Sequence, residues 1–347
     1  MPRPIYLVTL LPGLERWVED EIVDVSDGRV TFFAQERPDE LCFATDVAAE
    51  RFLGLQCAVA IFASLAYDVI RPKALLGDEL FAHICQSAET IVRRARDNAP
   101  FSTLRLSAAG EQTPVMQRLR RDLAASLGLR AVDDEGDLLV RLRPLAKGGW
   151  EVLLRLTPRP LATRAWRVIN FPGALNATLA QAMVRMTTPT PLDRFLNICC
   201  GSGTLLAERL LFGEAQSALG CDLDWDALGY ARENLTAAGV IGQAELETWD
   251  ATDMPLEPAS CDVIVGDIPF GQLMGTHATN LLLYPALIAE TARVAAPGAR
   301  LALLTHELRL MERALWDEPR WKIEAVMRVQ SGGMTPAVFV ARRTAME

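Results

Sequence analysis

The stretch CDVIVGDIPFG (residues 261–271) decides the fold that we expect for this chain. Its first part, residues 261–266, is a short apolar run typical of a buried strand in a parallel sheet. Its second part, residues 267–271, places an acid, a proline and an aromatic ring directly after that strand. We call residues 267–271 the corner. Open α/β sheets bind ligands at the carboxyl ends of their strands, so the corner predicts a ligand-binding site at this edge of the sheet.

A matching half lies upstream of this corner. The apolar run FLNICC (residues 195–200) leads into GSGT (201–204) and then a helical stretch, and later predicted strands end at Asp222 and, after residues 244–248, at Asp250. Glycines allow a tight turn and a close backbone approach, and an acid at the next strand end suits ribose hydroxyls. Asp250 is placed to accept a hydrogen bond from an adenine amino group. The set, rather than the common Gly-x-Gly turn alone, predicts a nucleoside-containing cofactor.

The tetrad Asp267-Ile268-Pro269-Phe270 resembles the Asp/Asn-Pro-Pro-Tyr/Phe motif of amino-directed class I methyltransferases, which use S-adenosylmethionine. Isoleucine stands where that family commonly has proline, and the acid and the ring stay in place. The longer run Asp267 to Gly275, followed by Asn280 and Tyr284-Pro285, is similar to the THUMP-containing guanine-N2 tRNA methyltransferases. This resemblance covers nearly the whole chain.

The resemblance implies an α/β fold: a Rossmann-like class I methyltransferase domain with a seven-stranded sheet, preceded by an α+β ferredoxin-like unit and a THUMP domain. Alternating strands and helices fit the ferredoxin-like unit. The stretch PLATRAWR (residues 160–167) resembles the closing segment of a THUMP domain. We expect these units at residues 1–68 (ferredoxin-like), 69–168 (THUMP), 169–190 (linker helix) and 191–347 (methyltransferase).

S-adenosylmethionine is therefore the expected cofactor, and methyl transfer to the exocyclic N2 of a guanine is the expected reaction. In such a reaction the Asp267 carboxylate and the Ile268 carbonyl accept hydrogen bonds from the amino group. Pro269 fixes the backbone, and Phe270 stacks on the extruded base. The residues expected to bind the cofactor are Asn176, Thr178, Asn197, Gly201, Ser202, Gly203, Thr204, Asp222, Leu223, Asp250, Ala251 and Asp267.

The expected substrate is a tRNA, methylated near the 5′ end of the acceptor stem at position 6 or its neighbour, with the THUMP domain holding the 3′ CCA end. The net charge of −9 looks wrong for an RNA-binding protein, but residues 86–189 hold 16 basic and 9 acidic side chains. Arginine suits phosphate because its planar fork donates two parallel hydrogen bonds. The residues expected to contact RNA are Arg118, Arg121, Arg141, Arg164, Arg167, Phe270 and Gly271.

Composition limits the remaining possibilities. No apolar run reaches the length of a membrane span, and the N-terminus lacks a signal-peptide core, so we expect a cytoplasmic protein with no membrane partner. Seven cysteines without a Cys-x-x-Cys pair, and three histidines, argue against a disulfide framework or a zinc site. We expect a monomer without bound metal.

Four other functions stay open at this point. The same chemistry could serve a guanine in large-subunit ribosomal RNA, although a single catalytic domain favours tRNA. Adenine-N6 methylation uses a similar corner but leaves the N-terminal units without a role. An inactive methyltransferase fold that only binds RNA is disfavoured by intact Gly201, Asp222 and Asp267. A dehydrogenase is disfavoured because no proton-relay residue accompanies the glycine turn.

Overall fold

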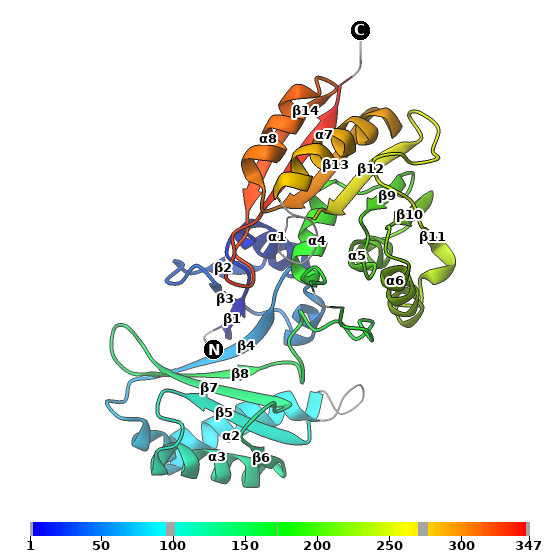
Figure 1. Ribbon diagram of the computed structural model, residues 1–347. Helices are drawn as coiled ribbons and strands as arrows, with labels where there is room; N and C mark the ends of the chain where they lie inside the picture. Colours follow the sequence, from blue (N-terminus) through cyan, green and yellow to red (C-terminus); the bar gives the residue numbers. More distant parts are fainter. Residues whose placement is uncertain (1–2, 95–100, 172, 270–276, 345–347) are drawn as a thin grey trace. The chain divides into compact units, whose positions relative to one another are not determined.

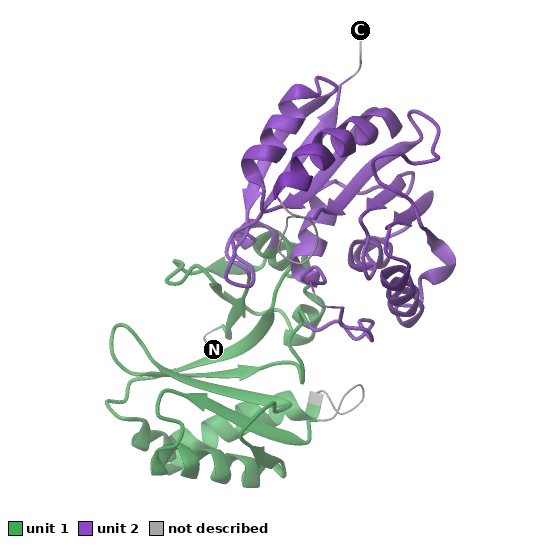
Figure 2. Cartoon of the chain, viewed as in Figure 1, with its two compact units in different colours: residues 1–10, 18–162 green, residues 11–17, 163–347 purple. Residues whose placement is uncertain are grey.

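The computed structural model describes residues 3–94, 101–171, 173–269 and 277–344 of the chain. The chain divides into two compact units, the first formed by residues 1–10 and 18–162 and the second by residues 11–17 and 163–347 (Figures 1 and 2). Each unit has its own sheet.

The described residues of the first unit form an eight-stranded sheet in the order β2-β3-β1-β4-β8-β7-β5-β6. Its strands are β1 (Ile5–Thr9), β2 (Val30–Phe32), β3 (Glu40–Thr45), β4 (Ala60–Tyr67), β5 (Thr103–Ala108), β6 (Arg130–Val132), β7 (Leu138–Pro144) and β8 (Trp150–Arg155). The helical elements are α1 (Glu15–Val25, whose first residues belong to the second unit), η1 (Ala49–Gly54), η2 (Pro72–Leu76), α2 (Asp78–Arg94) and α3 (Pro114–Leu127). Because β4 pairs with β8, residues 1–68 and 69–168 share one continuous sheet.

Helix α3 shows how local sequence sets an element of this unit. Pro114 occupies the first turn, where its missing N–H costs nothing, and Gly128 ends the helix with a left-handed φ of 66°. Leu119 and Leu123 are buried at helical spacing. Residues Thr113-Pro114 and Gly128 thus predict both ends of this helix from the sequence, and the structure confirms them.

The described residues of the second unit form a seven-stranded sheet in the order β11-β10-β9-β12-β13-β15-β14. Its strands are β9 (Arg194–Ile198), β10 (Ser217–Cys221), β11 (Glu245–Glu247), β12 (Cys261–Asp267), β13 (Ala295–Thr305), β14 (Trp321–Arg328) and β15 (Ala337–Arg343). Its helical elements are α4 (Ala177–Met186), α5 (Thr204–Phe212), α6 (Trp225–Ala237), η3 (Ile241–Gln243), α7 (His277–Val294) and α8 (Leu308–Asp317).

Strands β11, β10, β9, β12 and β13 run parallel, so their carboxyl ends meet at one edge of the sheet. The core beneath that edge is apolar: Leu196 and Ile264 are fully buried. The last two strands, β14 and β15, pair antiparallel at the other edge of the sheet. The sheet therefore brings the Gly-x-Gly turn, Asp222, Asp250 and the 267–269 corner to one edge.

Several elements differ from the expected ones. The sequence predicts a helix that begins near Tyr284-Pro285, but helix α7 begins at His277 and Pro285 lies inside it. A proline usually begins a helix because it lacks an N–H, so the sequence favoured the later start. Strands β3 and β6 and helices α6 and α8 were not anticipated, and the two strands are short or lie next to turns.

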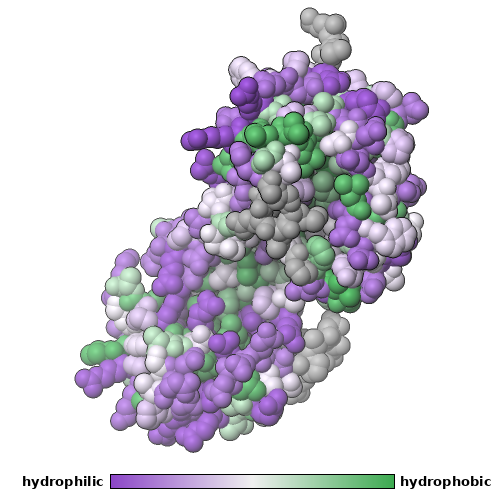
Figure 3. All heavy atoms as spheres, in the orientation of Figure 1, coloured by the Kyte–Doolittle hydropathy of each residue, from purple (hydrophilic) through white to green (hydrophobic). Residues whose placement is uncertain are grey.

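No helix in the part of the chain that the structure describes is long and apolar enough to cross a membrane. Within the same residues, no group of three or more His, Cys, Asp and Glu side chains is arranged to hold a metal ion. Hydrophilic side chains cover much of the face drawn in Figure 3, with apolar residues scattered among them. All seven cysteines are free thiols.

Candidate functional site

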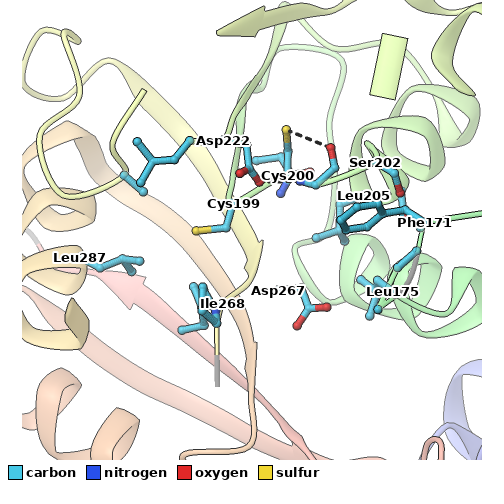
Figure 4. A pocket seen from close by; sticks show the side chains of 18 of the residues that line it. Phe171, Leu175, Cys199, Cys200, Ser202, Leu205, Asp222, Asp267, Ile268 and Leu287 are labelled. Carbon is cyan, nitrogen blue, oxygen red and sulfur yellow. Dashed lines mark hydrogen bonds between the residues drawn. The ribbon is translucent and has the colours of Figure 1, made fainter. Parts of the chain in front are cut away.

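A cavity of about 230 Å³ lies in the second unit, at the edge where the parallel strands end. It contains the glycine-rich loop after β9, the acids after β10 and β11, and the corner after β12 (Figure 4). The lining residues include Phe171, Gly173, Ala174, Leu175, Asn197, Cys199, Cys200, Gly201, Ser202, Thr204, Leu205, Asp222, Leu223, Trp249, Asp250, Ala251, Asp267, Ile268, Pro269, Leu283 and Leu287.

The loop after β9 needs its glycines for conformation and for space. Gly201 has a φ of +51° and Gly203 a φ of +78°, which is the left-handed region that glycine tolerates best. A Cβ on Gly203 would also lie 3.0 Å from the Ala231 Cβ of α6. The loop therefore turns tightly into α5 and presents Gly201, Ser202 and Thr204 to the cavity.

Two acids fix the cavity edge through backbone hydrogen bonds. The Asp222 carboxylate accepts from the Gly201 N–H at 2.8 Å and from the Asp224 N–H at 3.0 Å, so it ties β10 to the glycine loop. Asp250 accepts from the Thr252 N–H at 2.9 Å and the Thr252 hydroxyl at 2.7 Å. Each carboxylate oxygen has more than one acceptor site, so both acids keep acceptors for a ligand.

Asp267 is the most perturbed acid of the cavity. Its Oδ1 atom is buried without a hydrogen-bond partner, and burial raises the pKa of this carboxyl to about 7. Burial has this effect because it penalises the charged form. In Figure 4 the carboxylate extends into the open part of the cavity. A carboxyl with a raised pKa and a buried oxygen that has no partner, at a strand end in a cavity, is a candidate functional group.

A segment before α4, residues 164–175, forms one wall of the cavity through Phe171, Gly173, Ala174 and Leu175. We call it the strap. The buried side chain of Asn234 of α6 binds the strap and the glycine loop. Its amide oxygen accepts from the Ile169 N–H at 3.0 Å, and its amide nitrogen donates to the carbonyls of Ile169 (3.3 Å) and Ser202 (3.1 Å). The glycine loop and the strap are therefore joined through one side chain.

Two arginines of the strap, both expected from the sequence to contact RNA, form hydrogen bonds within the second unit. Arg164 forms a two-point ion pair with Glu208 at 2.7 and 3.2 Å, and its side chain is only 11% exposed. Arg167 donates to the Leu175 carbonyl at 2.8 Å and to the Thr204 hydroxyl at 2.9 Å, and burial lowers its pKa. Both guanidinium groups have partners inside the second unit, and a contact of either with an RNA phosphate stays a prediction.

The other predicted RNA contacts lie in the first unit or outside the described residues. Arg118 and Arg121 are exposed on α3, and Arg118 pairs with Asp122 at 3.2 Å. Arg141 lies over the Phe62 ring at 5.2 Å, and burial lowers the pKa of its guanidinium. Phe270 and Gly271, the remaining predicted contacts, fall outside the described residues.

Most of the predicted cofactor residues line the cavity, but three do not. Asn176 caps α4 by accepting from the Thr178 N–H at 2.9 Å and the Thr178 hydroxyl at 2.7 Å, and Thr178 is fully buried. Gly203 packs against α6 behind the loop. These three residues shape neighbouring elements, and any contact they make with a ligand stays a prediction.

Sequence reasoning missed several apolar residues of the cavity. Trp249 directly precedes Asp250 at the end of β11, and that position was a usable signal. Cys199, beside the glycine loop, has a left-handed φ of 48°, and burial raises the pKa of its thiol well above its usual value. Phe171 and Leu287 come from distant parts of the chain, and no local pattern indicated them.

A sheet in this order, with a glycine-rich loop after its first strand, acids at the next two strand ends and an acidic corner after the fourth, defines a class I methyltransferase domain. Residues 164–337 match the family described as RMKL-like, methyltransferase domain. The chain belongs to this family.

Comparison with known proteins supports the same class. The chain is 32% identical over 208 residues to tRNA (guanine(6)-N(2))-methyltransferase THUMP3 of Mus musculus, covering 56% of this chain and 41% of that protein. It is 32% identical over 206 residues to tRNA (guanine(6)-N2)-methyltransferase of Thermus thermophilus, covering 59% of this chain and 60% of that protein. These matches span about half the length of those relatives.

A solved structure resembles nearly the whole chain. The crystal structure of TrmN from Thermus thermophilus superposes with a TM-score of 0.75 at 25% identity. It covers 98% of this chain and 99% of that one. The likeness extends over both compact units rather than over the methyltransferase domain alone.

Proposed function

We propose that this protein transfers a methyl group from S-adenosylmethionine to the exocyclic N2 of a guanosine in the acceptor stem of tRNA, at position 6 or its neighbour. The observation that carries the proposal is the buried Oδ1 atom of Asp267, which has no hydrogen-bond partner and lies in a cavity that Ile268 also lines. The names of relatives that are 32% identical supply the substrate class.

The residues present fit this cofactor. Asp222 and Asp250 stand at adjacent strand ends with acceptors left for ribose hydroxyls and an adenine amino group. A Cβ built on Gly201 would meet nothing within 4 Å, so the loop leaves open space for a methionine chain. When bound, S-adenosylmethionine supplies a methyl group on a positively charged sulfur.

The corner then prepares the acceptor. A guanine amino group is a poor nucleophile because its lone pair is delocalised into the ring. Hydrogen bonds from its two N–H groups to Asp267 and to the Ile268 carbonyl turn the lone pair toward the methyl group and stabilise the developing positive charge. The C–S bond breaks as the N–C bond forms, and the Asp267 carboxylate takes the proton that leaves the nitrogen. The cavity supplies the required alignment.

The first unit is proposed to hold the tRNA. Its arginines Arg118 and Arg121, on α3, are exposed and suit phosphate contacts, whereas Arg164 and Arg167 already have partners within the second unit. Binding through the acceptor stem and the 3′ CCA end would set the distance between the tRNA end and the target base. A tRNA substrate would place the protein in the cytoplasm, and we propose that it acts as a monomer.

The test is to incubate purified protein with S-adenosylmethionine and an unmodified tRNA transcript, then to digest the RNA and identify methylated nucleosides by mass spectrometry. We expect N2-methylguanosine, and none from Asp267→Ala protein that still binds the cofactor. An equal yield from a ribosomal RNA fragment and none from tRNA would move the substrate to ribosomal RNA. Tight binding of tRNA without any methylated product would favour an RNA-binding protein with an inactive methyltransferase fold.

A further inference from the structure

Hydrogen bonds from two other elements hold the corner after β12 on both sides of the Ile268 carbonyl. The Ile268 N–H donates to the Leu304 carbonyl of β13 at 3.1 Å. The Tyr284 hydroxyl of α7 donates to the Pro269 carbonyl at 2.9 Å. The Ile268 carbonyl accepts no hydrogen bond from another described residue. This carbonyl is therefore the one unused backbone acceptor of residues 268–269, and it lies next to Asp267.

The hydrogen bond from Tyr284 is the last in a series of hydrogen bonds, here called the hydrogen-bond chain, in which each proton can be assigned to one atom. Tyr284 Oη lies 2.7 Å from the Thr305 Oγ1 atom, which accepts from the Glu307 N–H at 3.0 Å. A carbonyl can only accept, so the single Tyr284 proton points to Pro269. The Thr305 hydroxyl must then donate to Tyr284 Oη. Each hydroxyl in the chain consequently has one direction, and Thr305 orients Tyr284.

The hydrogen-bond chain lies in the protein interior. Tyr284 and Thr305 are both 0% exposed. Burial raises the pKa of Tyr284 to about 12, so its hydroxyl keeps its proton and remains a donor. Removing one partner of such a buried hydrogen bond leaves the other unsatisfied, which costs more than the bond itself contributes. The position of the Pro269 carbonyl is therefore strongly determined.

We propose that Tyr284, oriented by Thr305, is a positioning residue of the methyl-transfer site. By holding the Pro269 carbonyl, it fixes the backbone on the C-terminal side of Pro269. Because the proline ring locks φ, the preceding peptide plane, which carries the Ile268 carbonyl, is held with it. The Ile268 carbonyl and the Asp267 carboxylate are then both presented to the amino group of the substrate. This inference rests on the proposed function, because the acceptor pair matters only if an amino group is methylated. Tyr284 itself is not among the residues that line the cavity.

The direct test is Tyr284→Phe, which removes only the hydroxyl. We expect kcat for methylation to fall about tenfold or more, with the cofactor Kd and the KM for RNA unchanged. Thr305→Val should act in the same direction, whereas Thr305→Ser keeps a hydroxyl and should restore most of the rate. Because Tyr284 and Thr305 act through the same hydrogen-bond chain, the variant that combines Tyr284→Phe with Thr305→Val should be no slower than Tyr284→Phe alone.

A purely structural role would give a different result. The matched control is Tyr67→Phe in the first unit, which removes another buried tyrosine hydroxyl, 2.8 Å from His83 Nδ1. This variant should lose stability without losing kcat. Cofactor titration counts the folded sites in each preparation, so kcat is expressed per occupied site. If Tyr284→Phe does not fold, the comparison of Thr305→Val with Thr305→Ser tests the same chain.

Two results would overturn the inference while leaving the proposed function in place: wild-type kcat per occupied site in Tyr284→Phe, or losses of the two single variants that multiply in the double variant. Absence of any methylated nucleoside from the wild-type protein would instead remove the proposed function, and the positioning role with it. The wild-type reaction, measured in the same experiment, separates these outcomes.

Discussion

At the scale of single residues, the Asp267 carboxyl has a pKa that is raised into the neutral range. The carboxyl faces the cavity, yet Oδ1 is buried without a donor, and burial raises its pKa to about 7. Only the ionised carboxylate can take up the proton that leaves the amino group, and it is also the stronger hydrogen-bond acceptor. A bound amino group would supply the missing donor. The acid is thus arranged for a ligand rather than for the free protein.

The first prediction concerns the pH dependence of the reaction. We expect the single-turnover rate to rise with pH through about 7 and to level off above it, because ionised Asp267 is the active form. Quenched-flow measurement between about pH 5.5 and 8.5 gives the profile. A rate that is flat across this range would contradict the role of the carboxylate.

The second prediction concerns stability and follows from the same pKa. The folded-state pKa of about 7 lies above the usual 3.8, so the folded protein holds this proton more tightly than the unfolded chain. The contribution of this acid to the unfolding free energy is complete below about pH 4 and is lost as pH rises toward 7. Asp267→Asn should therefore gain stability relative to wild type between pH 5 and pH 8, on the order of 2 to 4 kcal/mol. Urea denaturation at both pH values measures the difference, and a pH-independent difference would refute the shift.

At the scale of elements, the strap and the glycine loop form one cofactor wall. Asn234 joins Ile169 to Ser202, and Arg167 joins Leu175 to Thr204. Phe171 of the strap also packs against the Tyr230 ring of α6, with centroids 5.7 Å apart. The strap should therefore control cofactor affinity.

The third prediction separates this role from RNA binding. Asn234→Ala and Arg167→Ala should each weaken cofactor binding about tenfold, because each leaves buried partners without a hydrogen bond. Binding of tRNA should change little. Arg121→Ala is the matched control: it removes an exposed arginine of α3 and should weaken tRNA binding while leaving cofactor affinity alone. Calorimetric titration with each ligand tests both, and the reverse pattern would return Arg167 to the RNA surface.

The sequence predicted the parts of the site that depend on local pattern. The apolar runs of β9 and β12, the loop at 201–204 and the corner at 267–269 are contiguous, and parallel strands bring their ends together. The strap was not predictable in this way, because Asn234 and Ile169 are 65 residues apart. The basic segment drew attention to Arg164 and Arg167 as phosphate ligands, but a charge count does not reveal that an acid or a hydroxyl already binds them.

At the scale of the whole molecule, charge is divided along the chain. Residues 86–189 hold 16 basic and 9 acidic side chains, whereas residues 190–300 hold 5 and 15. Binding of a polyanion releases counterions from its phosphates, so affinity falls as salt rises. The segment at 86–189 should therefore provide most of the salt-dependent affinity despite the net charge of −9.

The fourth prediction concerns how strongly tRNA binding depends on salt concentration. Arg118→Ala and Arg121→Ala should each reduce the slope of log Kd against log salt by about 1 if each residue neutralises one phosphate. The exposed arginine Arg232 of α6, changed to alanine, is the control and should leave the slope unchanged. Fluorescence anisotropy with labelled tRNA over a salt series gives the slopes. If all three variants keep the wild-type slope, the RNA binds to a surface other than α3.

The central claim is that the 267–269 corner directs a methyl group to the N2 atom of a guanine. It is tested most directly with two tRNA transcripts that differ at the target position, one carrying guanosine and the other inosine, which lacks only the 2-amino group. Under single-turnover conditions with labelled S-adenosylmethionine, we expect methyl transfer to the guanosine transcript and none to the inosine transcript, with equal binding of both. Equal methylation of the two transcripts would contradict the account.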